Sequence, residues 1–466
     1  MVGFRGPSLI IYDSPFTIHH SPFTMFDEAL QYLLSLGHET LAIKLGLATT
    51  KRLLEALGDP HLSYPSVQIA GTNGKGSTAA MLEGITCAAG IKTGLYTSPH
   101  LISITERIRN CGVEITREAF ALLATKIRTC AQQLVSEGAL PAPPTFFEQL
   151  TAIALLAFKE AGVELAILET GLGGRLDATT TAGARVVGIT QIALDHQQHL
   201  GSTLTEIAAE KAAIIRPGVR AIVAAQPPEV LDVILKRCAE CGVTPLMVES
   251  AFEPVSFDAN GLGRASFVTS HDRYEAVQIG LRGRHQIENA AIAIALAEAL
   301  RAEGFSIPRE SIASGLENLE HRGRLELHQG HPSILLDGAH NIAGAQALRA
   351  FIEEFVKPPI TLVFGAMGDK DLDGIAAVLF PIGAQLILTR PNNPRAAEVK
   401  SLLGLAPPGF ESSRITLTRN SEEALNAARA GTPPNGTICV TGSLYLVGEI
   451  LGSLNEQIAG RKPAEI

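Results

Sequence analysis

The sequence predicts an α/β protein with two domains: a large N-terminal domain with a mostly parallel sheet, and a smaller C-terminal doubly wound α/β domain. Three observations support this prediction. The chain has 466 residues, more than one hydrophobic core normally holds. Short β-rich runs alternate with helical segments, which is typical of parallel strands covered by helices on both faces. A glycine-rich turn joins the first of these runs to a helix of small residues.

The first predicted domain spans residues 23–319 and follows an extended lead-in at residues 1–22, which has prolines and little periodicity. Residues 25–57 look helical, with a break near Gly37. The strands of the sheet are predicted at 67–70, 93–97, 164–169, 185–190, 219–224 and 244–248. The interleaved helices are predicted near 117–136, 146–161, 203–214 and 228–240. Residues 252–281 predict an antiparallel appendage, and a helix near 286–303 follows it.

The second predicted domain spans residues 320–466, after a hinge at 318–326. Its strands are predicted at 333–337, 360–365, 384–389 and 437–441. Helices near 342–356, 371–379, 420–430 and 443–454 separate or follow these strands, as expected for a doubly wound sheet.

Composition excludes several classes of function. A net charge of −9 without a basic stripe argues against nucleic-acid binding. The apolar runs are shorter than the roughly 18 residues that span a membrane, and the N-terminus lacks signal-peptide features, so we expect a cytoplasmic protein. The six cysteines are scattered. Cys238 and Cys241 are interpreted as two reduced thiols rather than a redox or zinc pair.

The turn after residues 67–70 is the strongest chemical signal in the chain. Gly71, Gly74 and Gly76 let backbone N–H groups converge, Lys75 adds a positive charge, and the following helix adds its N-terminal dipole. This pattern predicts a P-loop that binds nucleoside triphosphate, so the first domain is P-loop ATPase-like. The alternative is a strand-to-helix turn without a ligand. In the usual P-loop, Ser or Thr follows the lysine directly, whereas here Gly76 precedes Ser77.

Polar residues at strand ends predict a magnesium site beside this loop. Glu169 ends one strand, Asp195 and His196 follow the next, and Ser98 follows a third. The carboxyl ends of parallel strands form the ligand-binding edge of such sheets, and Mg²⁺ prefers hard oxygen ligands. Each residue alone is a weak signal, but together they favour a metal site. The glycines after Glu169 do not complete a dinucleotide fingerprint, because Leu176 stands where the third glycine is needed.

For several other polar residues, the sequence pattern alone leaves the functional role open. Lys211 lies in a mostly apolar helix and is interpreted as a snorkelling lysine or a partner of Glu210 or Glu206. In the second domain, Asp337, His340 and Asn341 close a strand. Arg324 in the hinge is a candidate for neutralising phosphate charge, and His285, Gln286 and Asn289 at a helix start are candidates for contacting the nucleotide.

Taken in order, these motifs resemble the Mur ligase superfamily, and specifically the folylpolyglutamate synthase/dihydrofolate synthase family. The resemblance covers roughly residues 25–455 and is carried by residues 71–77, 96–101, 106–109, 145–148, 169–179, 195–196, 210–211, 285–289, 323–324, 337–341 and 441–445. The loop form with a glycine after Lys75 is the form that this family has.

The resemblance implies roles for individual residues. The ATP phosphates are implied to bind at Thr72, Asn73, Gly74, Lys75, Gly76 and Ser77, with Asn289, Arg324 and Asp337 holding ATP across the domain interface. Thr145, Leu176, Asp177 and Ala178 are implied to line the pterin or folate pocket. Two Mg²⁺ ions are assigned to Ser98, Glu169, His196 and Lys211. Lys211 is implied to be carbamylated, which reverses the interpretation above. Lys75, Lys211, His196 and Arg324 are the implied catalytic residues.

The implied activity is an ATP-dependent ligase that adds L-glutamate to a folate carboxylate through an acyl phosphate. The implied partners are ATP, L-glutamate and folate or dihydropteroate, the expected state is a monomer, and a monovalent cation is a further candidate cofactor. Dihydropteroate-using relatives often carry an acidic residue where Lys44 stands, so tetrahydrofolate polyglutamylation is the first expectation.

Two alternative functions share part of this sequence pattern. A ligase acting on a UDP-muramyl precursor would carry an extra N-terminal domain and a Ser or Thr directly after Lys75. A nucleotide-gated regulatory protein would not need Glu169, His196 and Lys211 together.

Overall fold

The structure is a computed structural model that describes residues 24–37, 46–248 and 252–460. The predicted lead-in at residues 1–22 lies outside the described residues. So does Lys44, which stands where dihydropteroate-using relatives often carry an acidic residue. Two helices open the described chain, α1 (Met25–Ser35) and α2 (Ala48–Ala56). They correspond to the predicted helical stretch and its break, and Gly37 just after α1 has a φ of 98°.

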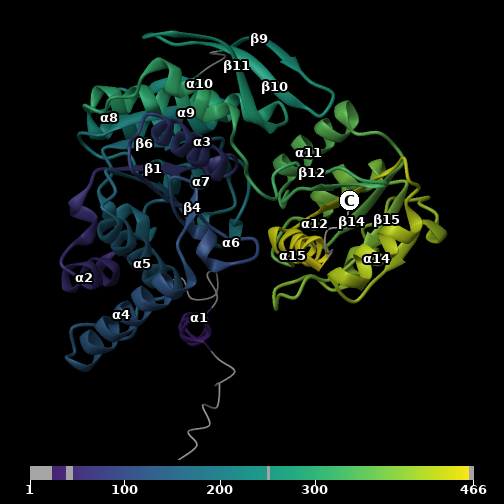
Figure 1. The fold of residues 1–466 in the computed structure, drawn as a ribbon, viewed down its shortest axis with the longest axis horizontal. Coiled ribbons are helices and arrows are strands. Elements are labelled where there is room, and N and C mark those ends of the chain that lie inside the picture. Colours follow the sequence, from purple (N-terminus) through teal and green to yellow (C-terminus); the bar gives the residue numbers. More distant parts are fainter. Residues whose placement is uncertain (1–23, 38–45, 249–251, 461–466) are drawn as a thin grey trace, which may run out of the picture.

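The larger part of the molecule, on the left in Figure 1, contains an eight-stranded sheet. Its strand order is β4-β3-β2-β5-β1-β6-β7-β8. Its strands are β1 (Ser66–Ala70), β2 (Thr93–Tyr96), β3 (Ile108–Asn110), β4 (Val113–Glu114), β5 (Leu165–Glu169), β6 (Val186–Ile189), β7 (Arg220–Ala224) and β8 (Leu246–Val248). The neighbouring strands β2, β5, β1, β6, β7 and β8 run parallel to one another. At one edge, β3 and β4 are added in antiparallel pairing. Pattern reasoning missed this edge, because strands of two and three residues carry no readable alternation.

Helices cover both faces of this sheet. They are α3 (Lys75–Ala88), α4 (Arg117–Ser136), α5 (Phe146–Ala161), α6 (Gln197–Leu200), α7 (Leu204–Ala212), α8 (Pro228–Cys241), α9 (His285–Ala302) and α10 (Arg309–Glu317). Successive strand residues face opposite cores: Ile167 packs in the core that contains α3 and α9, and Leu168 packs in the core that contains α4 and α5. Both faces of the central strands are therefore buried, as in other parallel sheets.

The predicted antiparallel appendage is a three-stranded sheet of β9 (Phe252–Phe257), β10 (Leu262–Val268) and β11 (Arg273–Arg282), in the order β11-β10-β9. It arches over the top of the molecule in Figure 1 toward the second domain. The rings of Phe257 in β9 and Phe355 in α11 (Ile342–Phe355) have centroids 5.4 Å apart. The appendage therefore bridges the two sheet-bearing parts of the chain.

A six-stranded sheet in the order β12-β13-β17-β14-β15-β16 forms the second part. Its strands are β12 (Glu326–His328), β13 (Ser333–Leu336), β14 (Ile360–Phe364), β15 (Gln385–Leu388), β16 (Ile415–Leu417) and β17 (Thr437–Thr441). With α11, its helices are α12 (Leu372–Leu379), α13 (Val399–Leu403), α14 (Ser421–Gly431) and α15 (Leu444–Gly460). The last strand, β17, lies in the middle. Residues 442–445 follow this strand, and the backbone N–H of Gly442 donates to the carbonyl of Ala339, just after β13, at 3.1 Å.

The structure also shows how the cysteines pair and whether a helix could cross a membrane. Cys87 at the end of α3 and Cys111 in the β3–β4 turn form a disulfide, which the sequence did not predict, while Cys238 and Cys241 are free thiols as expected. No helix in the described part of the chain combines the length and the apolarity that crossing a bilayer requires.

Candidate active site

The glycine-rich turn has the geometry expected of a phosphate-binding loop. α3 begins at Lys75, directly after Gly74, whose φ is 85°. A Cβ atom on Gly71 would lie 1.8 Å from Thr190 Oγ1, and one on Gly74 would lie 2.3 Å from Asn289 Oδ1. Both positions favour glycine, because Gly71 and Gly74 have φ values of 151° and 85°, which strain any residue with a Cβ atom, and neighbouring side chains lie close to the loop backbone there. The backbone N–H groups of Thr72 and Asn73 donate to the carbonyl of Gln191, which fixes the loop against the end of β6.

Lys75 lies over the loop with its amine turned inward. Its Nζ donates to the carbonyl oxygens of Gly71 and Thr72, both at 3.0 Å. Burial lowers the pKa of the Lys75 ammonium, and the carboxylates of Glu169 and Asp195 oppose that effect. The amine therefore stands where a phosphate oxygen would replace the loop carbonyls as its partner.

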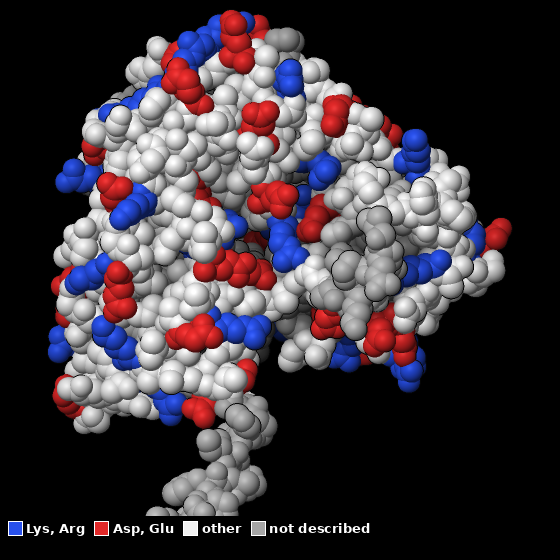
Figure 2. Space-filling model, in the orientation of Figure 1, with Lys and Arg blue, Asp and Glu red and all other residues white. Residues whose placement is uncertain are grey.

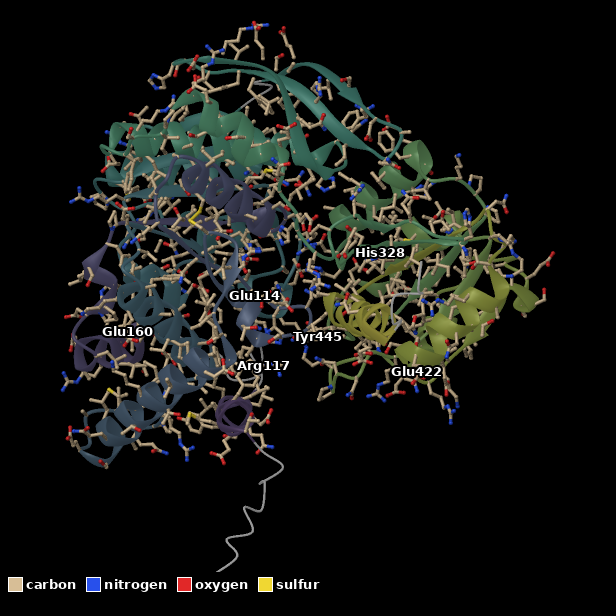
Figure 3. The ribbon with its side chains drawn as sticks, in the orientation of Figure 1. Glu114, Arg117, Glu160, His328, Glu422 and Tyr445 are labelled. Atoms are coloured by element: carbon tan, nitrogen blue, oxygen red, sulfur yellow. A yellow bond between two sulfur atoms is a disulfide. The ribbon has the colours of Figure 1, made fainter. Side chains whose placement is uncertain are left out.

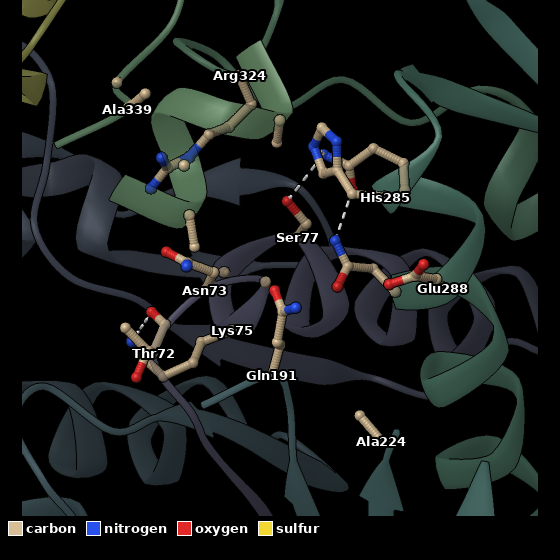
Figure 4. A pocket seen from close by; sticks show the side chains of 18 of the residues that line it. Thr72, Asn73, Lys75, Ser77, Gln191, Ala224, His285, Glu288, Arg324 and Ala339 are labelled. Carbon is tan, nitrogen blue, oxygen red and sulfur yellow. Dashed lines mark hydrogen bonds between the residues drawn. The ribbon is translucent and has the colours of Figure 1, made fainter. Parts of the chain in front are cut away.

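One cavity of about 300 Å³ brings together the residues predicted to bind nucleotide and metal. The predicted residues that line this cavity are Thr72, Asn73, Gly74, Lys75, Gly76, Ser77, Ser98, Glu169, His196, Lys211, Asn289, Arg324 and Asp337. Figure 4 shows the loop side chains with Arg324 and His285 across from them. In the space-filling view the molecule is hollowed between its two parts, and both acidic and basic side chains border the hollow (Figure 2).

Glu169 is the carboxylate of this cavity that best fits a divalent cation. It is buried at the carboxyl end of β5, and its Oε2 accepts a hydrogen bond from the backbone N–H of Ser98 at 3.1 Å. Within the described residues, no group of three or more His, Cys, Asp and Glu side chains gathers as a metal site. The residues present fit Mg²⁺ bound together with phosphate, since Mg²⁺ commonly takes one or two protein oxygens and completes its shell with phosphate and water.

Asp195 and His196 leave β6 at the same edge of the sheet. His196 has a φ of 51°, and burial lowers the pKa of its imidazole to about 3, so the ring is neutral with a nitrogen lone pair available. Burial alone would raise the pKa of Asp195, but the hydrogen bond from His340, together with the charge of Lys370, holds it well below its usual range. Asp195 Oδ1 lies 2.5 Å from Lys370 Nζ.

The position of Lys211 contradicts its interpretation as a snorkelling lysine or a partner of Glu210 or Glu206. It neither snorkels nor pairs with Glu210 or Glu206, because Glu210 pairs with Arg175 and Glu206 caps its own helix. Instead, buried Lys211 reaches across from α7 and donates from Nζ to the carbonyl of Gly71 at 2.7 Å. Burial, followed by the charge of Lys75, lowers the pKa of the Lys211 amine to about 7. A substantial fraction of this lysine is therefore uncharged near neutral pH.

The second domain contributes its own strand-end residues. Asp337 after β13 accepts hydrogen bonds from the backbone N–H groups of Leu325 and Ala339, both at 2.9 Å, which holds the segment that carries Arg324. Burial raises the pKa of Asp337, and Arg324 opposes that effect. The amides of Asn341 and Asn73 also face each other, with Asn341 Nδ2 3.0 Å from Asn73 Oδ1.

The N-terminal end of α9 also contacts the phosphate loop. Gln286 Nε2 donates to Ser77 Oγ at 3.4 Å, and Asn289 Nδ2 donates to Gln286 Oε1 at 3.0 Å. His285 Nε2 lies 3.1 Å from Gln286 Nε2. These contacts place the three candidate residues of this helix start at the nucleotide cavity.

A second cavity of about 520 Å³ holds the residues predicted to bind the pterin or folate. Thr145, Leu176, Asp177 and Ala178 line it, together with Ser98 and His196. Both carboxylate oxygens of Asp177 already bind backbone N–H groups of its own loop, those of Gly171, Leu172 and Thr179. Thr145 forms a capping box with Glu148 at the start of α5. These two side chains therefore shape the wall of the cavity.

Sequence reasoning missed the contribution of the second domain to this cavity. Met367, Lys370, Arg395, Ser443 and Tyr445 line it, and Figure 3 shows Tyr445 on the side of the second domain that faces the first. Lys370 lies in the loop that follows β14, at the same end of the sheet as Asp337, which directly follows β13. The rule that polar strand ends share one edge of a sheet could therefore have found it.

Comparison with known proteins identifies the family. The model of the Mur ligase middle domain matches residues 69–297, and that of the Mur ligase glutamate ligase domain matches residues 323–444. The dihydrofolate synthase/folylpolyglutamate synthase of Bacillus subtilis is 34% identical over 433 residues, which cover 92% of this chain and 99% of that protein. The chain belongs to the folylpolyglutamate synthase/dihydrofolate synthase family of Mur ligases. The family, fold class and ligase class predicted from the sequence are thereby confirmed.

Two further comparisons place this Mur ligase more closely. It is 36% identical over 432 residues to a probable bifunctional folylpolyglutamate synthase/dihydropteroate synthase of Halobacterium salinarum, covering 91% of this chain but 51% of that protein. The chain thus spans about half the length of that relative. The solved structure of Mycobacterium tuberculosis folylpolyglutamate synthase complexed with ADP has a TM-score of 0.85 and 32% identity, covering 95% of this chain and all of that one.

Proposed function

We propose that this Mur ligase uses ATP to add L-glutamate to a folate carboxylate, lengthening the tail of tetrahydrofolate and also converting dihydropteroate to dihydrofolate. The observation that carries the proposal is the junction of the two cavities. Ser98, His196 and His340 line both of them. A nucleotide whose phosphates rest on the loop at Lys75 and a carboxylate held in the second cavity would therefore meet at these residues. The proposed substrates are inferred from the names of the relatives.

The chain's own residues then account for the chemistry. Lys75 and Arg324 balance the negative charge on the transferring phosphoryl group while the folate carboxylate attacks it, giving an acyl phosphate and ADP. The amine of glutamate attacks the acyl carbon, and the tetrahedral intermediate collapses with loss of phosphate. The contacts of Asp195 with Lys370 and of Asn73 with Asn341 hold the second domain over the site, which keeps water from the acyl phosphate.

Ser98, Glu169, His196 and Lys211 are the residues that would hold two magnesium ions. When bound, magnesium supplies charge neutralisation at the phosphate oxygens. The neutral ring of His196 retains a free lone pair. The uncharged amine of Lys211 can add to carbon dioxide with release of one proton to solvent, giving a carbamate anion whose oxygens are hard ligands. We further propose that residues 23–319 and 320–466 are the two domains, and that the enzyme is a cytoplasmic monomer.

Mass spectrometry of reaction products tests the proposal. The purified protein receives ATP, Mg²⁺ and L-glutamate with dihydropteroate or with tetrahydrofolate in separate reactions. We expect one glutamate residue to be added to each acceptor. Addition to tetrahydrofolate alone would make the protein a dedicated polyglutamylating enzyme and remove the dihydropteroate part of the proposal. Addition to neither acceptor, with nucleotide still bound, would overturn the folate assignment.

A further inference from the structure

His321 lies in the segment that connects α10 to β12, three residues before Arg324, and it contacts the phosphate loop. A Cβ atom on Gly76 would lie 3.1 Å from His321 Cε1 and 3.4 Å from Glu169 Oε2. The imidazole and the carboxylate therefore both stand within van der Waals reach of one point beside Gly76. His321 enters the molecule from the connection between the two domains, and Glu169 enters from β5 in the first sheet.

This arrangement explains the glycine that separates Lys75 from Ser77. A side chain at residue 76 would press on the ring of His321, since a Cβ–Cε1 distance of 3.1 Å is tighter than nine in ten real contacts of a Cβ atom and the ring would have to shift. The histidine ring of the hinge thus stands close to the phosphate loop at the point where a side chain of residue 76 would begin.

The ring of His321 lacks a polar partner at one of its nitrogens. Its Nδ1 is buried and makes no hydrogen bond to any residue in the described part of the chain. Burial, with the charges of Arg324 and Arg109, lowers the pKa of the imidazole to about 3, so the ring is uncharged. A neutral ring with an unpartnered nitrogen gains little from polar contacts there, and its contribution is packing against Gly76.

We propose that His321 is a positioning residue: its ring packs on Gly76 and closes the space beside Glu169, so that the hinge determines where this carboxylate stands. The inference rests on the proposed function only in that Glu169 serves the magnesium bound with the nucleotide. Movement of the hinge that withdraws the ring would free the carboxylate to turn toward Gly76. His321 would thereby connect the position of the second domain to cation binding in the first.

Isothermal titration calorimetry of ADP, with and without Mg²⁺, tests this role without requiring turnover. We expect His321→Ala to reduce the enhancement of ADP affinity by Mg²⁺ about tenfold, the size typical when a residue supporting a metal ligand is lost. His321→Phe keeps an aromatic ring and removes the unpartnered nitrogen, so it should retain the enhancement within about twofold. The matched control is His61→Ala, because His61 is also partly buried with an unpartnered Nδ1 but lines a different cavity.

Each result decides the question. An unchanged Mg²⁺ enhancement in His321→Ala would overturn the proposal, and a loss in His321→Phe as large as that in His321→Ala would overturn the packing role. The thermal unfolding midpoint of each variant reports whether it is folded. Failure of the wild-type protein to bind ADP would instead count against the proposed function, so the two failures are distinguishable.

A double-mutant cycle supplies an independent test. Gly76→Ala should weaken ADP binding less in the His321→Ala background than in the wild type, because the closest contact of the new methyl group has been removed. Strictly additive effects of the two substitutions would contradict direct packing between the two residues.

Discussion

Lys75 and Lys211 have one hydrogen-bond acceptor in common. The Nζ atoms of both lysines donate to the carbonyl oxygen of Gly71, at 3.0 Å and 2.7 Å respectively. Two ammonium groups held this close repel each other, and the charge of Lys75 contributes to the lowered pKa of Lys211. The phosphate loop thus brings a lysine of its own helix and a lysine of α7 to one point. One of the two has a pKa close to neutrality.

Lys75→Ala should abolish turnover while leaving the fold intact. The substitution removes the one positive charge that the loop itself places at the phosphates, and we expect a loss of about a hundredfold or more in kcat. Product formation and the thermal unfolding midpoint measure the two effects. Exposed Lys92, which precedes β2, offers the matched control Lys92→Ala. Undiminished turnover in a folded Lys75→Ala variant would count decisively against the mechanism.

Lys211→Ala should lose most activity, and acetate should restore part of it. The small carboxylate can occupy the space left by the side chain and supply oxygens in place of the proposed carbamate. Turnover across an acetate titration, and the intact mass of the wild-type protein with and without bicarbonate, are the measurements. Full activity in Lys211→Ala together with no detectable carbamate would remove Lys211 from the proposed metal site.

Lys370→Met should destabilise the contact between the domains. Lys370 and Asp195 have side chains that are only 7% and 6% exposed, so removing the ammonium leaves a buried carboxylate without its closest charge partner. We expect a cost of about 3 kcal/mol, seen as a lower midpoint of urea unfolding, with exposed Lys51→Met as the control. The double variant Asp195→Asn/Lys370→Met should recover part of the loss. A midpoint equal to that of the wild type would show that the pair does not hold the domains together.

Glu326 should contribute stability that is lost in acid. Burial alone would raise its pKa, but the hydrogen bonds from His328 and from the backbone N–H of Gly323 lower it below the usual value. A carboxyl group with a lowered folded-state pKa stabilises the protein above its unfolded pKa of about 4.3, and the contribution disappears as the pH falls through the folded value.

We therefore expect Glu326→Gln to lose about 1 kcal/mol less stability than the wild type on acidification from neutral pH to about pH 3. Urea unfolding at a series of pH values measures this difference. Exposed Glu422, labelled in Figure 3, offers the control Glu422→Gln. Parallel pH profiles for the wild type and Glu326→Gln would contradict the role of this hinge carboxylate.

The predicted elements and the observed ones agree best where a pattern is long. The helices α4 and α5 begin and end at the predicted residues, because their apolar spacing is sustained over several turns and both begin at a threonine N-cap. The strands that were missed are β3, β4, β12 and β16, which have two or three residues each. So short a strand exists through its pairing with a neighbour, which local sequence does not encode.

Local sequence by itself determined the phosphate loop and the polar strand ends, because a strand, a glycine turn and a helix start are set by residues a few positions apart. The tertiary structure alone decided which distant groups meet. Lys211 reaches a carbonyl 140 residues earlier, Lys370 meets Asp195 across 175 residues, and Asn341 meets Asn73 across 268. These contacts depend on strand order and on how the two sheets face each other, since chain segments distant in sequence become neighbours only after the sheets assemble.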